Sequence, residues 1–306
     1  IGLLASPHST VEELALAGAL VRGLGSENID SRLRHADFGN LSATAGAARW
    51  LGMPIEALSQ LQRVLVVGSN LRKDHPLFAQ RIRQAARRGG QVHLLNDNSA
   101  DWALPVAQRV VQDSRHWVAE LAGIAAAIAL ETGAQAPVDA EVRDEAKAIA
   151  RTLLSGERKA VLLGNAAAHH EKASSLLSLA QWIGQQTGAQ VGYLTEAANT
   201  VGAQLVGAVP GSNGLHAGQM LSGGLKALLL LHTEPEHDTA ARASELNTAG
   251  MVVTLSAFKT NLDVSDVLLP VAPFTETSGS FVNAEGRLQS FHAVVKPLGE
   301  TRPAWK

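Results

Sequence analysis

The chain has 306 residues, of which 46% are hydrophobic and 18% are charged, a composition typical of a folded protein large enough for two cores. Its 26 basic and 28 acidic side chains give a net charge of −2, so bulk electrostatics favours neither nucleic acid nor an anionic membrane. The absence of cysteine excludes disulfides, cysteine-ligated zinc, iron–sulfur clusters and thiol catalysis within these residues. No apolar run reaches the roughly 18 residues that a membrane-spanning helix needs.

Short apolar runs that end in Gly, Ser or Asn alternate with longer Ala- and Leu-rich stretches of helical period. This alternation predicts parallel strands joined by crossover helices, and therefore an α/β fold. The predicted strands are residues 1–5, 64–67, 92–96, 160–163, 191–195, 227–231, 252–255 and 267–269. The predicted helices are residues 10–24, 76–88, 112–130, 139–155, 171–187 and 237–248.

The alternation is interrupted between residues 199 and 224, where turn-forming residues accumulate, and we place a lobe boundary there. Residues 1–200 then form a first α/β lobe with four or five strands. Residues 201–306 form a second lobe with about three strands, fewer than an ordinary sheet of about 5–6, which indicates an incomplete lobe. Its end, residues 270–306, is predicted to be an ordered loop and extended segment. Because the chain begins without Met in an apolar run, we expect a fragment of a longer protein.

Two predicted strands end in loops that suit a phosphate group. Open α/β sheets bind ligands at the carboxyl ends of their strands, and backbone N–H groups at a following helix start favour pyrophosphate. The dinucleotide and P-loop glycine patterns are both absent, so plain strand-to-helix turns are the simpler interpretation. The residues concerned are Gly68, Ser69, Asn70 and His75 after strand 64–67, and Gly164 and Asn165 after strand 160–163.

Other polar clusters favour structural interpretations. His169 and His170, followed by Glu171, point about 100° apart on a helix, so they cannot share a metal as an i, i+4 pair would. A second cluster follows strand 227–231 and is interpreted as a solvated loop that turns at Pro235. No G-x-S-x-G elbow supports a hydrolase. The second cluster consists of His232, Glu234, Glu236, His237 and Asp238, and a basic cluster on an exposed helix face consists of Arg81, Arg83, Arg87 and Arg88.

The most distinctive segment is the tail from residue 266 to residue 291, which is too apolar for a linker. Its polar residues are Glu276, Asn283, Glu285, Arg287 and Gln289. Arg287 beside Glu285 and Glu276 could form internal ion pairs that lock the loop, or it could bind a ligand.

These residues resemble the molybdopterin oxidoreductase family, and within it the branch formed by the large iron–sulfur subunits of respiratory complex I, the NADH:quinone oxidoreductase. The resemblance extends from the first strand to Trp305. It is carried by Gly68-Ser69-Asn70 with His75-Pro76, by residues 234–238, by Asp266-Val-Leu-Leu-Pro and above all by residues 276–289.

The resemblance implies two Rossmann-like lobes of the formate dehydrogenase and DMSO reductase type. In catalytic members such lobes hold a bis-pterin guanine dinucleotide with Mo or W. The complex I branch implies a cofactor-free structural module, without molybdopterin, on which assembly and hence electron transfer from NADH to quinone depend. Iron–sulfur clusters are expected in an N-terminal part of the full subunit. The implied partners are other peripheral-arm subunits on the cytoplasmic side of the inner respiratory membrane, without nucleic acid or direct membrane insertion.

Two departures bear on cofactor binding. Ala36 and its neighbours stand where formate-dehydrogenase-like relatives carry a Cys or selenocysteine metal ligand, although Asp37 could supply an oxygen ligand, as in some relatives. Asp97 and its neighbours replace an Asp-Pro-Arg stretch of the catalytic relatives. Asp97 could bind a ribose hydroxyl, but a solvated turn acid is the simpler interpretation.

The resemblance therefore implies no catalytic residue and no metal ligand in this chain. The loop residues after strands 64–67 and 160–163, with Asp97, are candidates for a vestigial cleft. Asn283, Glu285 and Arg287 are expected to hold the tail closed and keep the lobes docked. Two alternatives stay open. One is a cofactor-binding fragment of a catalytic enzyme such as a formate dehydrogenase, and the other is a nucleotide-binding protein that uses the Gly68 turn.

Overall fold

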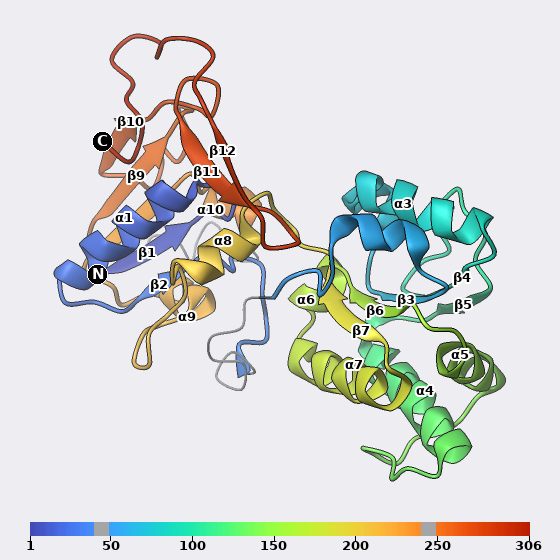
Figure 1. The fold of residues 1–306 in the computed structure, drawn as a ribbon. Coiled ribbons are helices and arrows are strands. Elements are labelled where there is room, and N and C mark those ends of the chain that lie inside the picture. Colours follow the sequence, from blue (N-terminus) through green and yellow to red (C-terminus); the bar gives the residue numbers. More distant parts are fainter. Residues whose placement is uncertain (40–48, 240–248) are drawn as a thin grey trace. The chain divides into compact units, whose positions relative to one another are not determined.

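The computed structural model describes residues 1–39, 49–239 and 249–306 (Figure 1). Contacts divide the chain into two compact units. The first unit contains residues 1–35, 46–48 and 197–306, and the second contains residues 36–45 and 49–196. Each unit has its own five-stranded parallel sheet.

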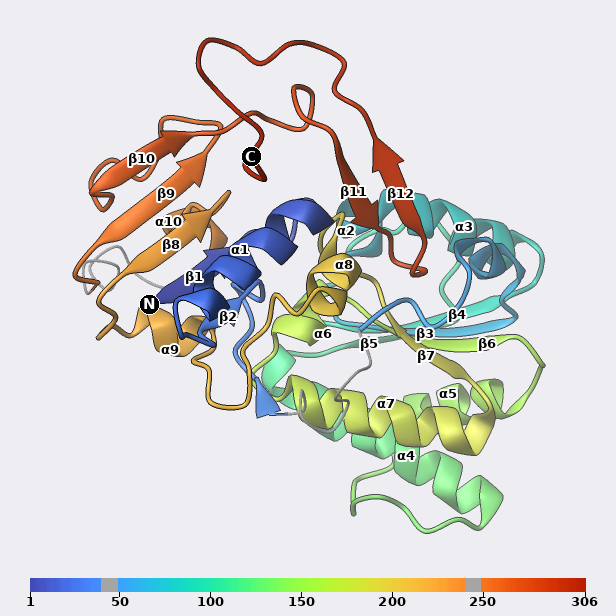
Figure 2. The same cartoon turned by 60° about the vertical axis from the view of Figure 1, so that its left-hand side comes forward.

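The sheet of the second unit has the strand order β5-β4-β3-β6-β7. Its strands are β3 (Arg63–Val67), β4 (Gln91–Asn96), β5 (Gln108–Val111), β6 (Lys159–Leu163) and β7 (Gln190–Tyr193). Its helices are η2 (Ile55–Gln60), α2 (Leu71–Asp74), α3 (Pro76–Arg87), η3 (Ser114–His116), α4 (Trp117–Thr132), α5 (Asp144–Leu154), α6 (Asn165–His169) and α7 (Ala173–Thr187). Helix α3 covers one face and α4, α5 and α7 cover the other (Figures 1 and 2). The central strands are therefore apolar almost throughout, as a sheet buried on both faces requires.

The sheet of the first unit has the strand order β10-β9-β8-β1-β2. Its strands are β1 (Gly2–Ala5), β2 (Ile29–Asp30), β8 (Leu228–Leu231), β9 (Val252–Ser256) and β10 (Val267–Pro270), and an antiparallel hairpin follows, formed by β11 (Gly279–Val282) and β12 (Leu288–Phe291). Its helices are α1 (Val11–Gly23), α8 (Thr200–Leu205), α9 (Ala217–Leu221) and α10 (Pro235–Asp238). Successive side chains of β1 serve opposite faces, since Leu3 packs with α1 and α8 whereas Leu4 packs with α9.

The predicted α/β class, with parallel sheets flanked by helices, is confirmed, and each of the eight predicted strands is present within two residues at either end. Helix α1 begins as predicted because Thr10 and Glu13 form a reciprocal capping box. Helix α4 begins later than residue 112, because Asp113 caps the short η3 first. Most of the predicted helix 237–248 lies outside the described residues.

The division of the chain differs from the predicted boundary at residue 200. Leu3 of β1 lies opposite Leu229 of β8, and β2 pairs with β1, so residues 1–35 share a sheet with the segment after residue 201. The sheet that we expected to have about three strands therefore has five. An apolar parallel strand such as β1 carries no mark of its partner, and the partner is far away along the chain.

Candidate functional site

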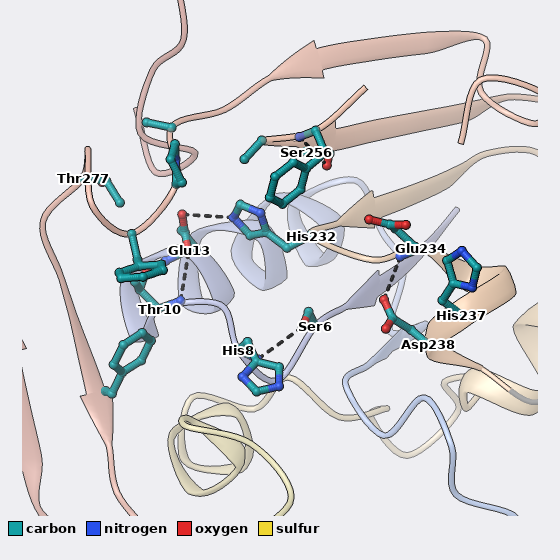
Figure 3. A pocket seen from close by; sticks show the side chains of 16 residues that line it. Ser6, His8, Thr10, Glu13, His232, Glu234, His237, Asp238, Ser256 and Thr277 are labelled. Carbon is teal, nitrogen blue, oxygen red and sulfur yellow. Dashed lines mark hydrogen bonds and ion pairs between the residues drawn. The ribbon is translucent and has the colours of Figure 1, made fainter. Parts of the chain in front are cut away.

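A pocket of about 490 Å³ lies at the carboxyl edge of the first-unit sheet (Figure 3). Ser6 follows β1, His232 follows β8, Ser256 ends β9, and Ala272 comes two residues after β10. All four strands are parallel, so their carboxyl ends meet at this edge, where open α/β sheets bind ligands. The other lining residues are His8, Thr10, Glu13, Glu234, His237, Asp238, Ala257, Phe258, Pro273, Phe274, Thr277 and Phe281.

A buried carboxylate faces this pocket from the start of α1. The side chain of Glu13 is only 3% exposed; its Oε2 accepts the Thr10 N–H at 2.8 Å, and its Oε1 lies 3.3 Å from Nε2 of His232. Burial alone would raise the pKa of Glu13, but the hydrogen bond and charge of His232 and the Thr10 N–H outweigh it, so the pKa lies below its ordinary value. Glu13 is therefore a fixed negative charge of the pocket.

The turn after β8 places two further carboxylates. His232 has a φ of +50°, in the left-handed region that non-glycine residues adopt when surrounding contacts enforce it. Its N–H donates to the Leu255 carbonyl at 2.9 Å. The Glu234 N–H then donates to Oδ2 of Asp238 at 2.7 Å, which closes the short helix α10. The solvated-loop interpretation of residues 232–238 is thus corrected, because only Pro235 and two others of the seven, Thr233 and Glu236, lie outside the pocket lining.

Sequence reasoning pointed to His232, Glu234, His237 and Asp238 but missed the residues of the other strands. Ser6, His8 and Glu13 belong to β1 and α1, and Phe258 and Phe274 follow β9 and β10. The strand-end rule that we applied to residues 64–67 and 160–163 would have found them if it had been applied to strand 1–5 as well.

The loops after β3 and β6, in the second unit, pack directly against each other. The Gly68 carbonyl accepts N–H groups from Ala166 at 3.0 Å and Ala167 at 3.3 Å, at the start of α6. A Cβ on Gly68, whose φ is +62°, would lie 2.6 Å from the Ala167 nitrogen, and one on Gly164 would lie 2.3 Å from Cβ of Ser69. Backbone groups that a phosphate would need are therefore already bonded within the chain.

Four polar atoms beside these loops are buried without a hydrogen-bond partner in the described part of the chain. The Asn165 side chain lies beside the His75 ring, which also stacks on Phe78 with 5.9 Å between ring centroids. Burial lowers the pKa of His75, although Asp74 and Asn165 act in the opposite direction. The four atoms are Ser69 Oγ, Asn70 Oδ1, His75 Nε2 and Asn165 Oδ1.

Asp97 lies apart from this set. It is exposed and accepts a hydrogen bond from its neighbour Asn98 at 2.7 Å, which is the contact of a solvated turn acid.

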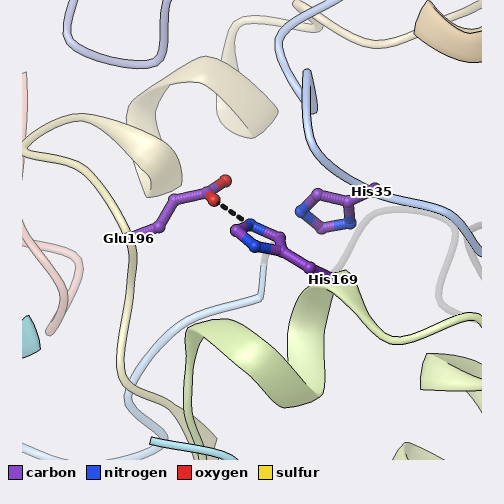
Figure 4. A group of neighbouring side chains, drawn as sticks. All are labelled: His35, His169 and Glu196. Atoms are coloured by element: carbon purple, nitrogen blue, oxygen red, sulfur yellow. Dashed lines mark hydrogen bonds and ion pairs between the residues drawn. The ribbon is translucent and has the colours of Figure 1, made fainter. Parts of the chain in front are cut away.

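The histidines near α6 have structural partners. His170 Nδ1 accepts the Lys172 N–H at 2.9 Å, which leaves Nε2 to donate to the Ser114 carbonyl at 2.9 Å. The ring of His170 also stacks on Trp117. The His169 ring points to the carboxylate of Glu196 and forms an ion pair with it (Figure 4).

Asp37, the candidate oxygen ligand, caps helix α7. Its Oδ1 accepts the Gly39 N–H at 2.9 Å, and its Oδ2 accepts the Ser174 N–H at 2.8 Å. Burial acts to raise the pKa of Asp37, but these two N–H donors lower it below its ordinary value. Both oxygens are thus committed to the backbone, which does not fit a metal ligand.

The tail residues form the turn of the β11–β12 hairpin. Asn283 Oδ1 accepts N–H groups from Glu285 at 3.1 Å and Arg287 at 2.9 Å, and Gly286 supplies a φ of +85°. Nε of Arg287 lies 3.0 Å from Oε1 of Glu285. Glu276 is used elsewhere, since it accepts the Leu298 N–H at 2.9 Å.

The hairpin is anchored to the first unit through its backbone. The Ser280 N–H donates to Oε2 of Glu12 at 2.9 Å, and the Val282 N–H donates to Oδ1 of Asn199 at 2.8 Å. Asn199 is fully buried, and its Nδ2 donates to the Ser9 carbonyl at 2.8 Å. One amide therefore joins β11, α8 and the segment that leads into α1.

Two parallel-sheet units with ligand-type strand edges, together with this tail motif, agree with a match to a family model. The chain belongs to the molybdopterin oxidoreductase family, whose model matches residues 1–306. It is 23% identical over 329 residues to a subunit of the NADH-quinone oxidoreductase of Salmonella typhimurium, and 27% identical over 354 residues to the subunit of the same name from Streptomyces coelicolor. These matches cover 96% and 98% of this chain but only 36% and 40% of the relatives.

A likeness in fold extends to a solved structure. A chain of the formyltransferase/hydrolase complex from Methylorubrum extorquens, determined with methylofuran, superimposes with a TM-score of 0.66 at 20% identity, over 99% of this chain and 88% of that one. In the described residues, no helix is both long and apolar enough to cross a membrane.

Proposed function

We propose that this chain is the cofactor-free, molybdopterin-like module of the large iron–sulfur subunit of an NADH:quinone oxidoreductase, where it serves assembly rather than chemistry. Similarity over nearly the whole chain to two NADH-quinone oxidoreductase subunits of the same name supports this assignment. The observation that carries the proposal is the closed edge of the second unit. There the Gly68 carbonyl takes the N–H groups that begin α6, and the two loops leave no room for a Cβ at Gly68 or Gly164.

The residues present do not fit a Mo or W site. Such a metal needs an anionic protein donor beyond its dithiolenes, and the chain contains no cysteine. Asp37, the acidic residue at the corresponding stretch, gives both oxygens to backbone N–H groups. We therefore derive no catalytic step for these residues. Iron–sulfur clusters, if this module shares a polypeptide with them as in the resembling subunits, belong to another part of it.

The partners that follow from this proposal are other peripheral-arm subunits of the same complex. The module would then lie on the cytoplasmic side of the respiratory membrane and be held there by those subunits.

The decisive experiment is elemental analysis for Mo and W on the full-length subunit, purified anaerobically within its active complex. A pterin fluorescence assay on the denatured supernatant accompanies it. We expect neither metal nor pterin above the level of a control preparation. Near-stoichiometric metal and pterin in active complex would contradict the structural role.

One observation favours an alternative, namely a cofactor-binding piece of a catalytic molybdopterin enzyme. Ser69, Asn70, His75 and Asn165 each hold a buried polar atom that lacks a partner in the described residues, and buried polar groups ordinarily have one. Titration of guanosine diphosphate into the full-length protein separates the two functions. Saturable binding that Asn165→Ala abolishes would favour the alternative, whereas the assembly module predicts none.

A further inference from the structure

The pocket of the first unit carries an excess of negative charge. Its lining includes the carboxylates of Glu13, Glu234 and Asp238, and no lysine or arginine lies among its lining residues. Glu13 already shares its charge with His232. The carboxylate of Glu234, by contrast, has no hydrogen-bond or ion-pair partner within residues 1–39, 49–239 and 249–306. The acidic end of the pocket is therefore open to a cation.

Aromatic rings stand at the other side of the same pocket. The side chains of Phe258 and Phe274 line it and are 70% and 71% exposed, an unusual position for large apolar groups. Exposed rings beside carboxylates favour a guanidinium, which stacks on an aromatic face while it forks to a carboxylate.

An apolar rim continues from Phe274 along the tail. We define this rim as Phe258, Phe274, Val294, Val295 and Leu298, all of which are more than half exposed. The Val294 N–H donates to the Thr275 carbonyl at 2.9 Å, and the Leu298 N–H donates to Glu276, so these residues are tied to the segment that follows Phe274. Apolar surface of this kind, gathered around a cavity, is typical of an interaction site.

Two buried hydroxyl groups indicate a ligand with carbonyl oxygens. Ser6 and Ser256 line the pocket and are only 7% and 6% exposed. Each hydroxyl oxygen accepts a backbone N–H, from His8 at 3.3 Å and from Phe258 at 3.0 Å respectively. Within the described residues neither hydroxyl hydrogen has an acceptor. A peptide carbonyl would supply one, whereas a simple cation would not.

We propose that this pocket binds a short segment of a partner protein that inserts an arginine side chain between Phe258 and Phe274 towards Glu234 and Asp238. The carbonyls of the segment accept from Ser6 and Ser256, and its apolar neighbours cover the rim. The volume of about 490 Å³ is in the range of specific pockets, about 300–1,000 Å³, and exceeds the needs of one side chain. The inference specifies the partner chemistry of the assembly role proposed above and is tested separately from it.

The test measures peptide binding to the purified full-length polypeptide by isothermal titration calorimetry. The probe is the blocked pentapeptide Ala-Leu-Arg-Leu-Ala, with norleucine or glutamate versions of the central position as matched probes. We expect the arginine peptide to bind about tenfold or more tightly than the norleucine peptide, and the glutamate peptide not to bind. Glu234→Gln should weaken arginine-peptide binding about tenfold, and Phe274→Ala should weaken it several-fold.

Glu236→Gln is the control variant, because Glu236 is an exposed acid of the same short helix outside the pocket lining. Its binding should equal that of the unaltered protein. Equal binding of all three peptides, binding of none, or an equal loss in Glu236→Gln would overturn the proposal. So would displacement of the peptide by guanosine monophosphate, which would assign the pocket to nucleotides. Mo and pterin analysis does not enter this test, so either proposal can fail alone.

Discussion

Single buried groups hold the first unit together, and Asn199 is the most connected of them. Its side-chain amide bonds to Ser9 and Val282, which belong to different elements. Asn199→Ala leaves two buried backbone groups unsatisfied, and we expect a loss of about 2–4 kcal/mol in the free energy of unfolding. Urea denaturation followed by circular dichroism measures it. Asn98→Ala, in an exposed turn, is the control, and an equal loss there would refute the assigned role.

Gly68 is required by both its backbone conformation and its surroundings. Its φ is +62°, and a Cβ would lie 2.6 Å from the Ala167 nitrogen and 2.7 Å from the Trp117 ring. Gly89 also has a positive φ, of +91°, but nothing lies within 4 Å of its Cβ position. Gly89→Ala should therefore cost about 1 kcal/mol, from backbone strain alone, whereas Gly68→Ala should cost several kcal/mol. Thermal unfolding of the two variants compares them, and equal costs would contradict the packing argument.

His93 makes the stability of the second unit depend on pH. Both ring nitrogens are buried without a partner in the described residues, and burial, with a smaller contribution from Arg63, lowers the pKa of His93 to about 4. Between pH 6.5 and 4 the unfolded chain binds a proton that the native chain does not, so stability falls as the pH falls through this window. The loss attributable to this group reaches about 3 kcal/mol.

Replacement of His93 by Leu tests this expectation. The difference in unfolding free energy between His93→Leu and the unaltered protein should grow as the pH is lowered from 6.5 to 4. His116→Leu, at an exposed position, is the control and should give a difference that does not change with pH. A pH-independent difference for His93→Leu would show that the buried ring does not titrate in this window.

At the scale of elements, the hairpin turn shows how two residues of one motif differ in importance. Asn283 holds two backbone N–H groups, whereas Arg287 is 71% exposed in its ion pair with Glu285. Exposed pairs contribute about 0–1 kcal/mol, so Arg287→Ala should have a small effect on stability, and Asn283→Ala should cost about 1–2 kcal/mol. Neither change should alter electron transfer in the assembled complex. Chemical denaturation and NADH oxidation assays check both points, and a reversed order of costs would be inconsistent with this turn.

Local signals predicted elements well where they were dense. The capping box at Thr10 and Glu13 placed the start of α1, and the proline at position 76 placed the start of α3. Strand β2 has only two residues, and β5 alternates charged and apolar positions within four residues, so neither carries enough periodicity to be recognised. The hairpin was expected only as an extended segment, because its turn depends on Asn283 and Gly286 acting together.

At the scale of the whole molecule, the second unit is nearly continuous in sequence and the first is not. We expect a polypeptide of residues 36–196 to fold cooperatively by itself, since it contains a complete five-stranded sheet and its core. Residues 201–306 alone should not fold, because β8 would lose its neighbour β1 and the unit would lose α1. Far-ultraviolet circular dichroism and thermal melting decide the matter. A cooperative transition for residues 201–306 would show that β1 is dispensable.

The sequence by itself determined the α/β class, the positions of eight strands, the family and two of the strand-end loops. It could do so because strands buried on both faces must be apolar throughout, and because loop and tail motifs are local. Only the tertiary structure decided which strands share a sheet and which residues form the pocket. The imidazole of His232 and the carboxylate of Glu13 meet across 219 positions of the chain, and the register of parallel strands, which brings them together, is set by packing rather than by any local pattern.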